Sequence, residues 1–321
     1  MDLHLLADNL SNPALLFFFL GILAVQLKSD LEIPANSSKF ISLYLLFSIG
    51  FKGGQELAHS PFSWEIVWSL LLGIALAIAV PLYAFLILRR RFSVANAGAI
   101  AASYGSVSAV TFVTAISFLE IENITYGGHM VAVMALMEAP SIVVGVLLIA
   151  LFDKKNGSAL SLPQVCRHSL TNGSVLLILG SLLIGLLASE HQAQGIAPFT
   201  TDIFKGFLAV FLLDMGISSG SKLSALVKKG WFALLFAILV PLVNGCLTVL
   251  VTSAFLSNPG DRFLFAILAA SASYIAVPAA MRLAAPKANP SLYLPMALAI
   301  TFPFNITLGM PLYFYLVQLT A

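Results

Sequence analysis

Two short runs of small and hydroxyl-bearing residues interrupt otherwise apolar stretches of the sequence. The first is AASYGSVSAV at 101–110, and the second is SASYIAVPAA at 271–280. Gly105 in the first run and Pro278 in the second disfavour a continuous helix. The N-terminus of a half-helix that follows such a break offers free N–H groups and a positive dipole end to a small anion. The chemistry that these runs predict is anion binding, with serine hydroxyls adding hydrogen bonds.

The two runs occupy equivalent places in two halves of the chain. GFKGGQEL at 50–57 and GISSGSKL at 216–223 share a pattern, and MAL recurs at 134–136 and 296–298. The common order of these matches indicates an internal repeat. Small residues alone also fit close helix packing, with the hydroxyls bonded to their own helices. The symmetric placement of the two runs favours ligand binding over that alternative.

The elements that position these runs are membrane spans. The chain is 60% hydrophobic and only 9% charged, whereas soluble domains carry about 25% charged residues. A span needs about 20 mainly apolar residues. Apolar runs between charged or Pro/Gly/Asn-rich breaks predict ten spans: 12–27, 39–57, 63–88, 93–119, 125–152, 172–189, 200–221, 230–256, 262–285 and 290–318.

Basic residues fix the expected orientation. Of the 16 Lys and Arg residues, all but Lys52, Lys205 and Arg262 fall on one side of the membrane, in loops or near span ends. Cytoplasmic loops are enriched in Lys and Arg, so both termini of this plasma (inner) membrane protein are expected outside.

Each half contains five spans, and because five is odd, the second half enters the membrane inverted. We therefore predict an all-α integral membrane fold of ten transmembrane helices, in which two discontinuous helices cross. The two inverted five-helix repeats are residues 1–152 and 172–321, and a cytoplasmic linker at 153–171 joins them within one membrane domain.

Polar groups in the fifth and tenth spans are candidates for a cation site. Intramembrane ionisable residues are rare and functional by default, and sodium takes oxygen ligands as calcium and magnesium do. The alternative is a protonated, hydrogen-bonded Glu138 and an Asn305 that bridges helices. Asp214, in the inner half of the seventh span, is either a coupling-ion ligand or a carboxylate at the cytoplasmic mouth. The candidate sodium ligands are Glu138, Ser141, Thr301, Asn305 and Asp214.

Several functional classes lack support in the sequence. It contains no H-E-x-x-H pair, no Cys/His ligand spacing and no G-x-x-x-x-G-K-[ST] phosphate loop. A serine nucleophile needs a base at its own depth, and Glu138 is the one candidate. We therefore expect neither an ATP-driven pump nor an enzyme, and no nucleic-acid partner.

At four motifs the sequence resembles the sodium-dependent bicarbonate transporters best known from cyanobacteria. The motifs are AASYGSVSAVTF, ALMEAPSIVVG, FLLDMGISSG and AASASYIAVPAAMR, and the similarity runs through nearly the whole chain. The resemblance implies a core domain and a gate domain, sodium-coupled bicarbonate symport into the cytoplasm, a homotrimer and a PII-like cytoplasmic regulator. The loop at 153–171 is shorter than in many members, a departure that bears on the regulator rather than on transport.

The resemblance also places the bicarbonate site on this chain, at the crossing of the fourth and ninth spans with sodium nearby. Gly105 lets the backbone approach the anion, and Ser106 and Ser108 offer hydroxyls. The expected substrate-binding residues are Ser103, Tyr104, Gly105, Ser106, Val107, Ser108, Ser273, Ala276 and Val277.

Three other readings compete with bicarbonate symport. The first is a sodium symporter of another small organic anion on a bile-acid-transporter-like fold. An integral membrane enzyme and a sensor that binds without transport are the others. A bulky substrate requires a wide cavity lined by aromatic or Met side chains, whereas Ser, Ala and Gly surround both predicted breaks. The composition of the breaks therefore favours a small ligand.

Overall fold

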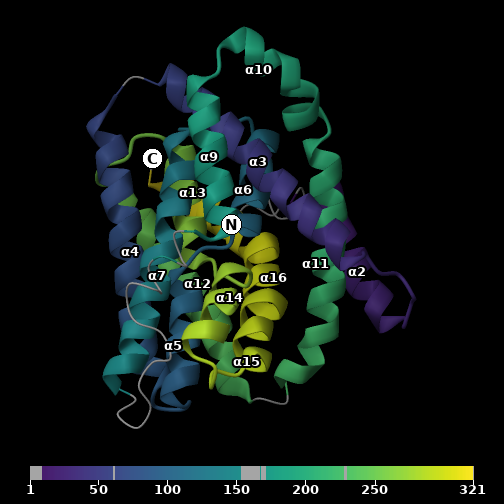
Figure 1. Cartoon of the computed structure of the whole chain (residues 1–321), viewed down its shortest axis with the longest axis vertical. Coiled ribbons are helices and arrows are strands. Elements are labelled where there is room, and N and C mark those ends of the chain that lie inside the picture. Colours follow the sequence, from purple (N-terminus) through teal and green to yellow (C-terminus); the bar gives the residue numbers. More distant parts are fainter. Residues whose placement is uncertain (1–8, 61, 153–166, 168–170, 228–229, 321) are drawn as a thin grey trace.

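A computed structural model describes residues 9–60, 62–152, 167, 171–227 and 230–320. Within these ranges every regular element is a helix (Figure 1). The predicted linker at 153–171 lies almost entirely outside the described residues.

In the first half of the chain, each predicted span coincides with one helix or with a pair of half-helices. Ser93 and Ser108 begin the two half-helices of the fourth span, since each side chain accepts a hydrogen bond from the backbone N–H three residues later. The elements are α2 (Pro13–Gln26), α3 (Ala35–His59), α4 (Trp64–Leu88), α5 (Val94–Gly105), α6 (Ala109–Ile121) and α7 (His129–Phe152).

The second half repeats this order of elements with two differences. The first difference is a helix that begins at Glu190 and precedes the seventh span. The second is that the tenth span contains wide π-helical turns near Pro295 and Pro303. A proline has no N–H and cannot donate the usual helical hydrogen bond. The elements are α9 (Gly173–Leu187), α10 (Glu190–Ala197), η1 (Pro198–Asp202), α11 (Phe204–Val227), α12 (Trp231–Thr252), α13 (Pro259–Ala270), α14 (Ala276–Ala284), α15 (Pro290–Pro295), η2 (Met296–Thr301), α16 (Phe302–Phe304), η3 (Asn305–Gly309) and α17 (Met310–Leu319).

In the part of the chain that the structure describes, six helical segments are long and apolar enough to cross a membrane. Two shorter apolar helices, α2 and α9, occupy the predicted first and sixth spans. Helix α3 and the pair α13–α14 occupy the predicted second and ninth. The six long segments are Trp64–Leu88, Val94–Ile121, His129–Phe152, Glu190–Leu223, Trp231–Thr252 and Pro290–Leu319.

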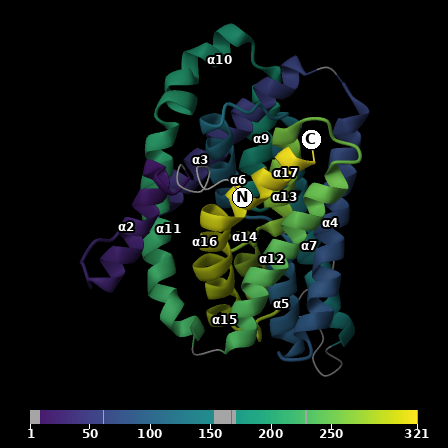
Figure 2. The same cartoon turned by 180° about the vertical axis from the view of Figure 1, so that it is seen from behind.

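Glycines set the packing of the outer helices. Helix α2 packs against α11, and α3 packs obliquely against α9 (Figures 1 and 2). A Cβ at Gly54 would meet the backbone of α9, and one at Gly216 would meet the backbone of α2. Only glycine permits such close helix contact. The repeated pattern at 50–57 and 216–223 therefore serves helix packing in both halves.

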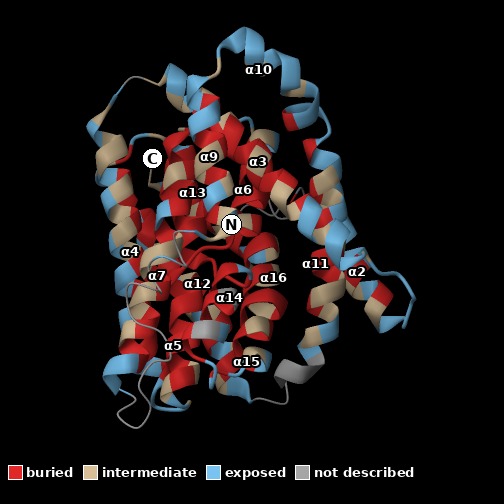
Figure 3. Ribbon diagram, in the orientation of Figure 1, coloured by how far each residue is buried: buried red, intermediate tan, exposed pale blue. Residues whose placement is uncertain are grey.

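The broken helices form the interior of the molecule. In the most apolar window of Val94–Ile121, 94% of the residues are buried, against 33% in Trp64–Leu88. The buried residues concentrate in the centre of the bundle, while α10 and the outer faces of α4 and α11 are exposed (Figure 3). The segments that carry the polar runs are thus shielded by the other helices.

Candidate functional site

The two helix breaks are hydrogen-bonded to each other. The backbone N–H of Ser273 donates to the Ser103 carbonyl at 2.8 Å, and the Ser103 hydroxyl donates to the Ser273 carbonyl. The N–H of Ser108 donates to the Ser271 hydroxyl at 3.0 Å. Backbone groups freed within a membrane need such protein partners. The breaks therefore form one unit.

The second break lies before the proline that signalled it. Helix α13 ends at Ala270 and α14 begins at Ala276. Pro278 is the third residue of α14 and lies in its first turn. Residues of the first turn donate no helical hydrogen bond, so the missing N–H of proline costs nothing there. It therefore marks the start of the second half-helix rather than the interruption itself.

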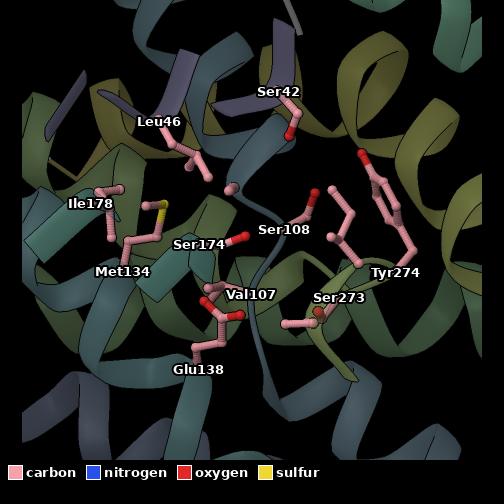
Figure 4. A pocket seen from close by; sticks show the side chains of 13 residues that line it. Ser42, Leu46, Val107, Ser108, Met134, Glu138, Ser174, Ile178, Ser273 and Tyr274 are labelled. Atoms are coloured by element: carbon pink, nitrogen blue, oxygen red, sulfur yellow. The ribbon is translucent and has the colours of Figure 1, made fainter. Parts of the chain in front are cut away.

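A small cavity of about 30 Å³, here called the central cavity, lies beside both breaks (Figure 4). Ala109 and Ala276, the first residues of α6 and α14, both line it. Two helix N-termini therefore adjoin one cavity, an arrangement that favours an anion. The lining residues are Ser42, Leu46, Val107, Ser108, Ala109, Met134, Glu138, Ser174, Ile178, Ser273, Tyr274, Ile275 and Ala276.

The size of the central cavity limits what it can hold. A water molecule requires about 10–15 Å³ by this measure, and the cavity offers about 30 Å³. It accommodates a ligand of a few non-hydrogen atoms. A steroid-sized anion does not fit in this conformation.

Among the described residues that line the central cavity, Glu138 supplies the one carboxylate. Its side chain extends from α7 toward Val107 (Figure 4). None of the described residues forms a hydrogen bond or an ion pair with it, and no Lys or Arg is among the residues that line the cavity. An anion that enters this space meets two helix N-termini and a carboxylate.

Two of the predicted sodium ligands satisfy the ends of broken helices instead of lining the cavity. The Ser141 hydroxyl donates to the Ala102 carbonyl at 2.9 Å, and Asn305 Nδ2 donates to the Ala270 carbonyl at 2.8 Å. Ser141 lies in the fifth span and bonds near the C-terminus of α5. Asn305 lies in the tenth span and bonds at the C-terminus of α13, so the two contacts match between the halves. Asn305 Oδ1 is buried and has no partner among the described residues.

Thr301 and Tyr104 form a second buried pair outside the central cavity. The Thr301 hydroxyl donates to the Ala237 carbonyl at 2.7 Å, so it accepts from the Tyr104 hydroxyl at 2.8 Å. Tyr104 also packs edge-on against Phe236. These contacts fix α5 against α12 and η2.

Of the remaining predicted substrate residues, Ser106 and Val277 are buried without lining the central cavity. The N–H of Val277 donates to the Ser273 hydroxyl at 3.4 Å. The Ser106 hydroxyl has no partner among the described residues. Thus Val107, Ser108, Ser273 and Ala276 are the predicted substrate residues that the fold brings to the cavity.

Gly105 is required by helix packing. A Cβ at this position would collide with the ring of Pro81 on α4 and lie 2.5 Å from the Ser141 hydroxyl on α7. No side chain fits there unless α5 moves away from both neighbours.

Gly105→Ala is expected to destabilise the folded protein by about 1–3 kcal/mol through overpacking. The matched control is Gly180→Ala on α9, because a Cβ at Gly180 meets nothing within 4 Å. Thermal unfolding in detergent compares the two variants. A midpoint for Gly105→Ala equal to that of Gly180→Ala would contradict this packing account.

Asp214 lies in a second cavity, the vestibule, of about 480 Å³. It accepts a hydrogen bond from the Ser38 hydroxyl at 2.5 Å, and Lys39 and Lys222 also line this space. The vestibule and the central cavity share Ser42, Ser174, Tyr274 and Ile275 among their lining residues. The two spaces therefore adjoin, and Asp214 belongs to the approach rather than to the central cavity.

Two serines that line the central cavity, Ser42 and Ser174, are not among the residues predicted from the sequence. Ser42 comes from α3 and Ser174 from α9, the two helices that pack against each other. Neither lies in a repeated motif. Tyr274 also lines the cavity and lies within the second polar run, but it is not a predicted substrate residue, although its counterpart in the repeat, Tyr104, is.

In the described part of the chain no three His, Cys, Asp or Glu side chains come together as a metal centre. The described geometry is that of a multi-pass membrane protein with a small cavity at the breaks of two buried helices, lined by apolar side chains and by a few hydroxyls and one carboxylate. A family model described as the Na+-dependent bicarbonate transporter superfamily matches residues 13–318, and the chain belongs to this family. Membership confirms the resemblance, supports sodium-dependent anion transport and makes the protein a transporter rather than an enzyme. Among curated proteins, none matches the chain.

Proposed function

We propose that the protein is a symporter that couples sodium entry to bicarbonate import into the cytoplasm. The observation that carries this proposal is the convergence of the α6 and α14 N-termini on the central cavity, through Ala109 and Ala276. Bicarbonate is a small monovalent anion whose oxygens accept hydrogen bonds from backbone N–H groups and serine hydroxyls, and its one O–H donates.

Glu138 provides the coupling. Two like charges about 4 Å apart repel by about 4 kcal/mol at an effective dielectric constant of about 20. A sodium ion bound by the Glu138 carboxylate offsets that repulsion, so the anion binds well only when sodium is present. The side-chain oxygen of Asn305, which has no hydrogen-bond partner in the described ranges, is a second candidate ligand. Ser141 and Thr301 keep free lone pairs, and Asp214 in the vestibule is a candidate for sodium on its way to the cytoplasm.

We further propose ten transmembrane helices in two inverted repeats. A pair of matching contacts supports this. The N–H of Gly127, just before α7, donates to Asp261 at 2.6 Å, and the N–H of Asn289, just before α15, donates to Asn96 at 2.7 Å. Asp261 is the third residue of α13 and Asn96 is the third residue of α5, so the two acceptors occupy matching positions in the two broken helices. In each contact, the loop that precedes the last span of one half binds the broken helix of the other half.

The conformation supports a substrate path toward the cytoplasm. Lys39 and Lys222 lie near one end of α3 and α11 and line the vestibule. Near the opposite ends of these helices, Glu120 of α6 pairs with Lys52 at 3.3 Å and with Lys205 at 3.4 Å. Because Lys and Arg are enriched in cytoplasmic loops, the vestibule is expected on the cytoplasmic side and the paired charges on the outer side.

Uptake of radiolabelled bicarbonate into proteoliposomes tests the proposed function. An inward sodium gradient should drive accumulation, and a potassium gradient of the same size should not. Binding of bicarbonate without accumulation would identify a sensor. Accumulation of a small organic anion with bicarbonate excluded would instead favour the alternative symporter. The homotrimer and the PII-like regulator stay predictions of the family resemblance.

The proposed topology predicts that both chain ends lie outside the cell. Thr320 is held at the same end of the bundle as the start of α13, because Arg262 donates to its carbonyl at 3.2 Å. A cysteine at Thr320 should react with an impermeant maleimide from outside, and one at Arg90, in the loop after α4, should not. The reverse labelling pattern would overturn the orientation and the span count.

A further inference from the structure

A buried amide in the middle of α12 lies outside both cavities. Asn244 is 9% exposed and lines neither the central cavity nor the vestibule. A buried amide is costly unless it is hydrogen-bonded. Asn244 Oδ1 accepts from the Tyr83 hydroxyl at 2.6 Å, and Nδ2 donates to the Ala269 carbonyl at 3.1 Å. Both ends of the amide are thus used for contacts between helices.

The break in α13 explains why Ala269 needs a partner. In a continuous helix, its carbonyl accepts from the N–H of residue 273. Here the N–H of Ser273 donates across the crossing to Ser103 at 2.8 Å. The Ala269 carbonyl loses its helical partner and receives the amide of Asn244 instead. The next carbonyl, that of Ala270, receives the amide of Asn305 at 2.8 Å.

Tyr83 holds the edge of the amide that faces away from the break. An asparagine side chain has one acceptor group and one donor group. The Ala269 carbonyl can only accept, so the NH2 group faces it, and the Tyr83 hydroxyl donates to Oδ1 on the other edge. Tyr83 lies on α4, two residues after Pro81, whose ring occupies the space beside Gly105 at the other break. Helix α4 therefore contacts one break directly and reaches the other through Asn244.

We propose that Asn244, held in place by Tyr83, is a positioning residue for the anion site. It holds the last turn of α13, from which the chain continues into Ser273 and Ala276 of the central cavity. The inference rests on the proposed function, in which this cavity binds bicarbonate. Neither Asn244 nor Tyr83 touches the anion, so their effect is on the geometry of the groups that do.

Asn244→Leu tests the inference because it preserves the approximate volume and removes both hydrogen bonds. Leaving the Ala269 carbonyl unpaired is expected to raise the KM for bicarbonate at saturating sodium by about tenfold. The maximal uptake rate should change little. Tyr83→Phe keeps the hydrogen bond from the Asn244 amide to Ala269 and removes the one to Oδ1, so a smaller increase of about threefold is expected.

Tyr313→Phe is the matched control. It removes a tyrosine hydroxyl that also bonds α12, at the Pro241 carbonyl, 3.1 Å away, but it does not affect the break. The KM of this variant should equal that of the wild type. An equal rise in KM for Tyr313→Phe and Tyr83→Phe, or an unchanged KM for Asn244→Leu, would overturn the positioning role.

Hydrogen exchange separates this inference from the proposed function. Without any substrate, amides between residues 271 and 277 should exchange faster in Asn244→Leu than in the wild type, while those of α9 should not change. If the wild type does not transport bicarbonate, the proposed function fails, and the exchange result still decides whether Asn244 holds the break. Unchanged exchange at 271–277 would refute the positioning role on its own.

Discussion

Replacement of Glu138 by glutamine is expected to make bicarbonate affinity almost independent of sodium. The substitution keeps the shape of the side chain and removes the carboxylate from the central cavity. A repulsion of about 4 kcal/mol corresponds to about a thousandfold in affinity. The variant should therefore bind bicarbonate much more tightly than the wild type when sodium is absent. Isothermal titration with bicarbonate, with and without sodium, measures this difference.

Glu138→Asp is the control, because it retains the charge with a shorter side chain. It should keep the sodium dependence even if its affinities are lower. A Glu138→Gln variant that behaves like the wild type would show that Glu138 is protonated and structural. The coupling would then have to come from other oxygens, with Asn305 the first candidate.

Filling the central cavity should abolish uptake without unfolding the protein. Ala276→Val adds two carbon atoms at the start of α14, in a space of about 30 Å³. The added carbon atoms occupy the room that an anion needs. Overpacking of this size costs about 1–3 kcal/mol of stability, so the rest of the bundle should stay intact. We expect sodium-driven uptake to fall by about a hundredfold. Ala109→Val, at the start of α6, should have the same effect because that residue lines the same cavity.

Ala79→Val provides the comparison, since Ala79 is exposed on the outer face of α4. It should be expressed, inserted and active like the wild type. Uptake is measured per mole of protein that elutes as a single peak in detergent. Normal uptake by both Ala276→Val and Ala109→Val would place the substrate elsewhere.

The positions of the two helix breaks were largely predictable from the sequence. Gly105 is the last residue of α5, and the second polar run contains the interruption between Ala270 and Ala276. These signals are local, because a backbone break needs small or helix-breaking residues at the site itself. Their matching placement was also readable, since the order of helices in the first half recurs in the second.

The direction in which side chains point was not predictable in the same way. Glu138 and Ser141 are three residues apart on α7, yet the first lines the central cavity and the second binds Ala102. Membrane depth can be read from the chain, but the rotation of a buried helix depends on its neighbours. Ser42 and Ser174 illustrate this limit, because only the packing of α3 against α9 brings them to the cavity.

The most direct test of the account is the affinity of the purified wild-type protein for bicarbonate at several sodium concentrations. If sodium and the anion bind together, bicarbonate affinity should rise with sodium, and sodium affinity should rise with bicarbonate by the same factor. Potassium should have no effect at the same ionic strength. A bicarbonate affinity that does not change with sodium would contradict sodium-coupled transport through this cavity.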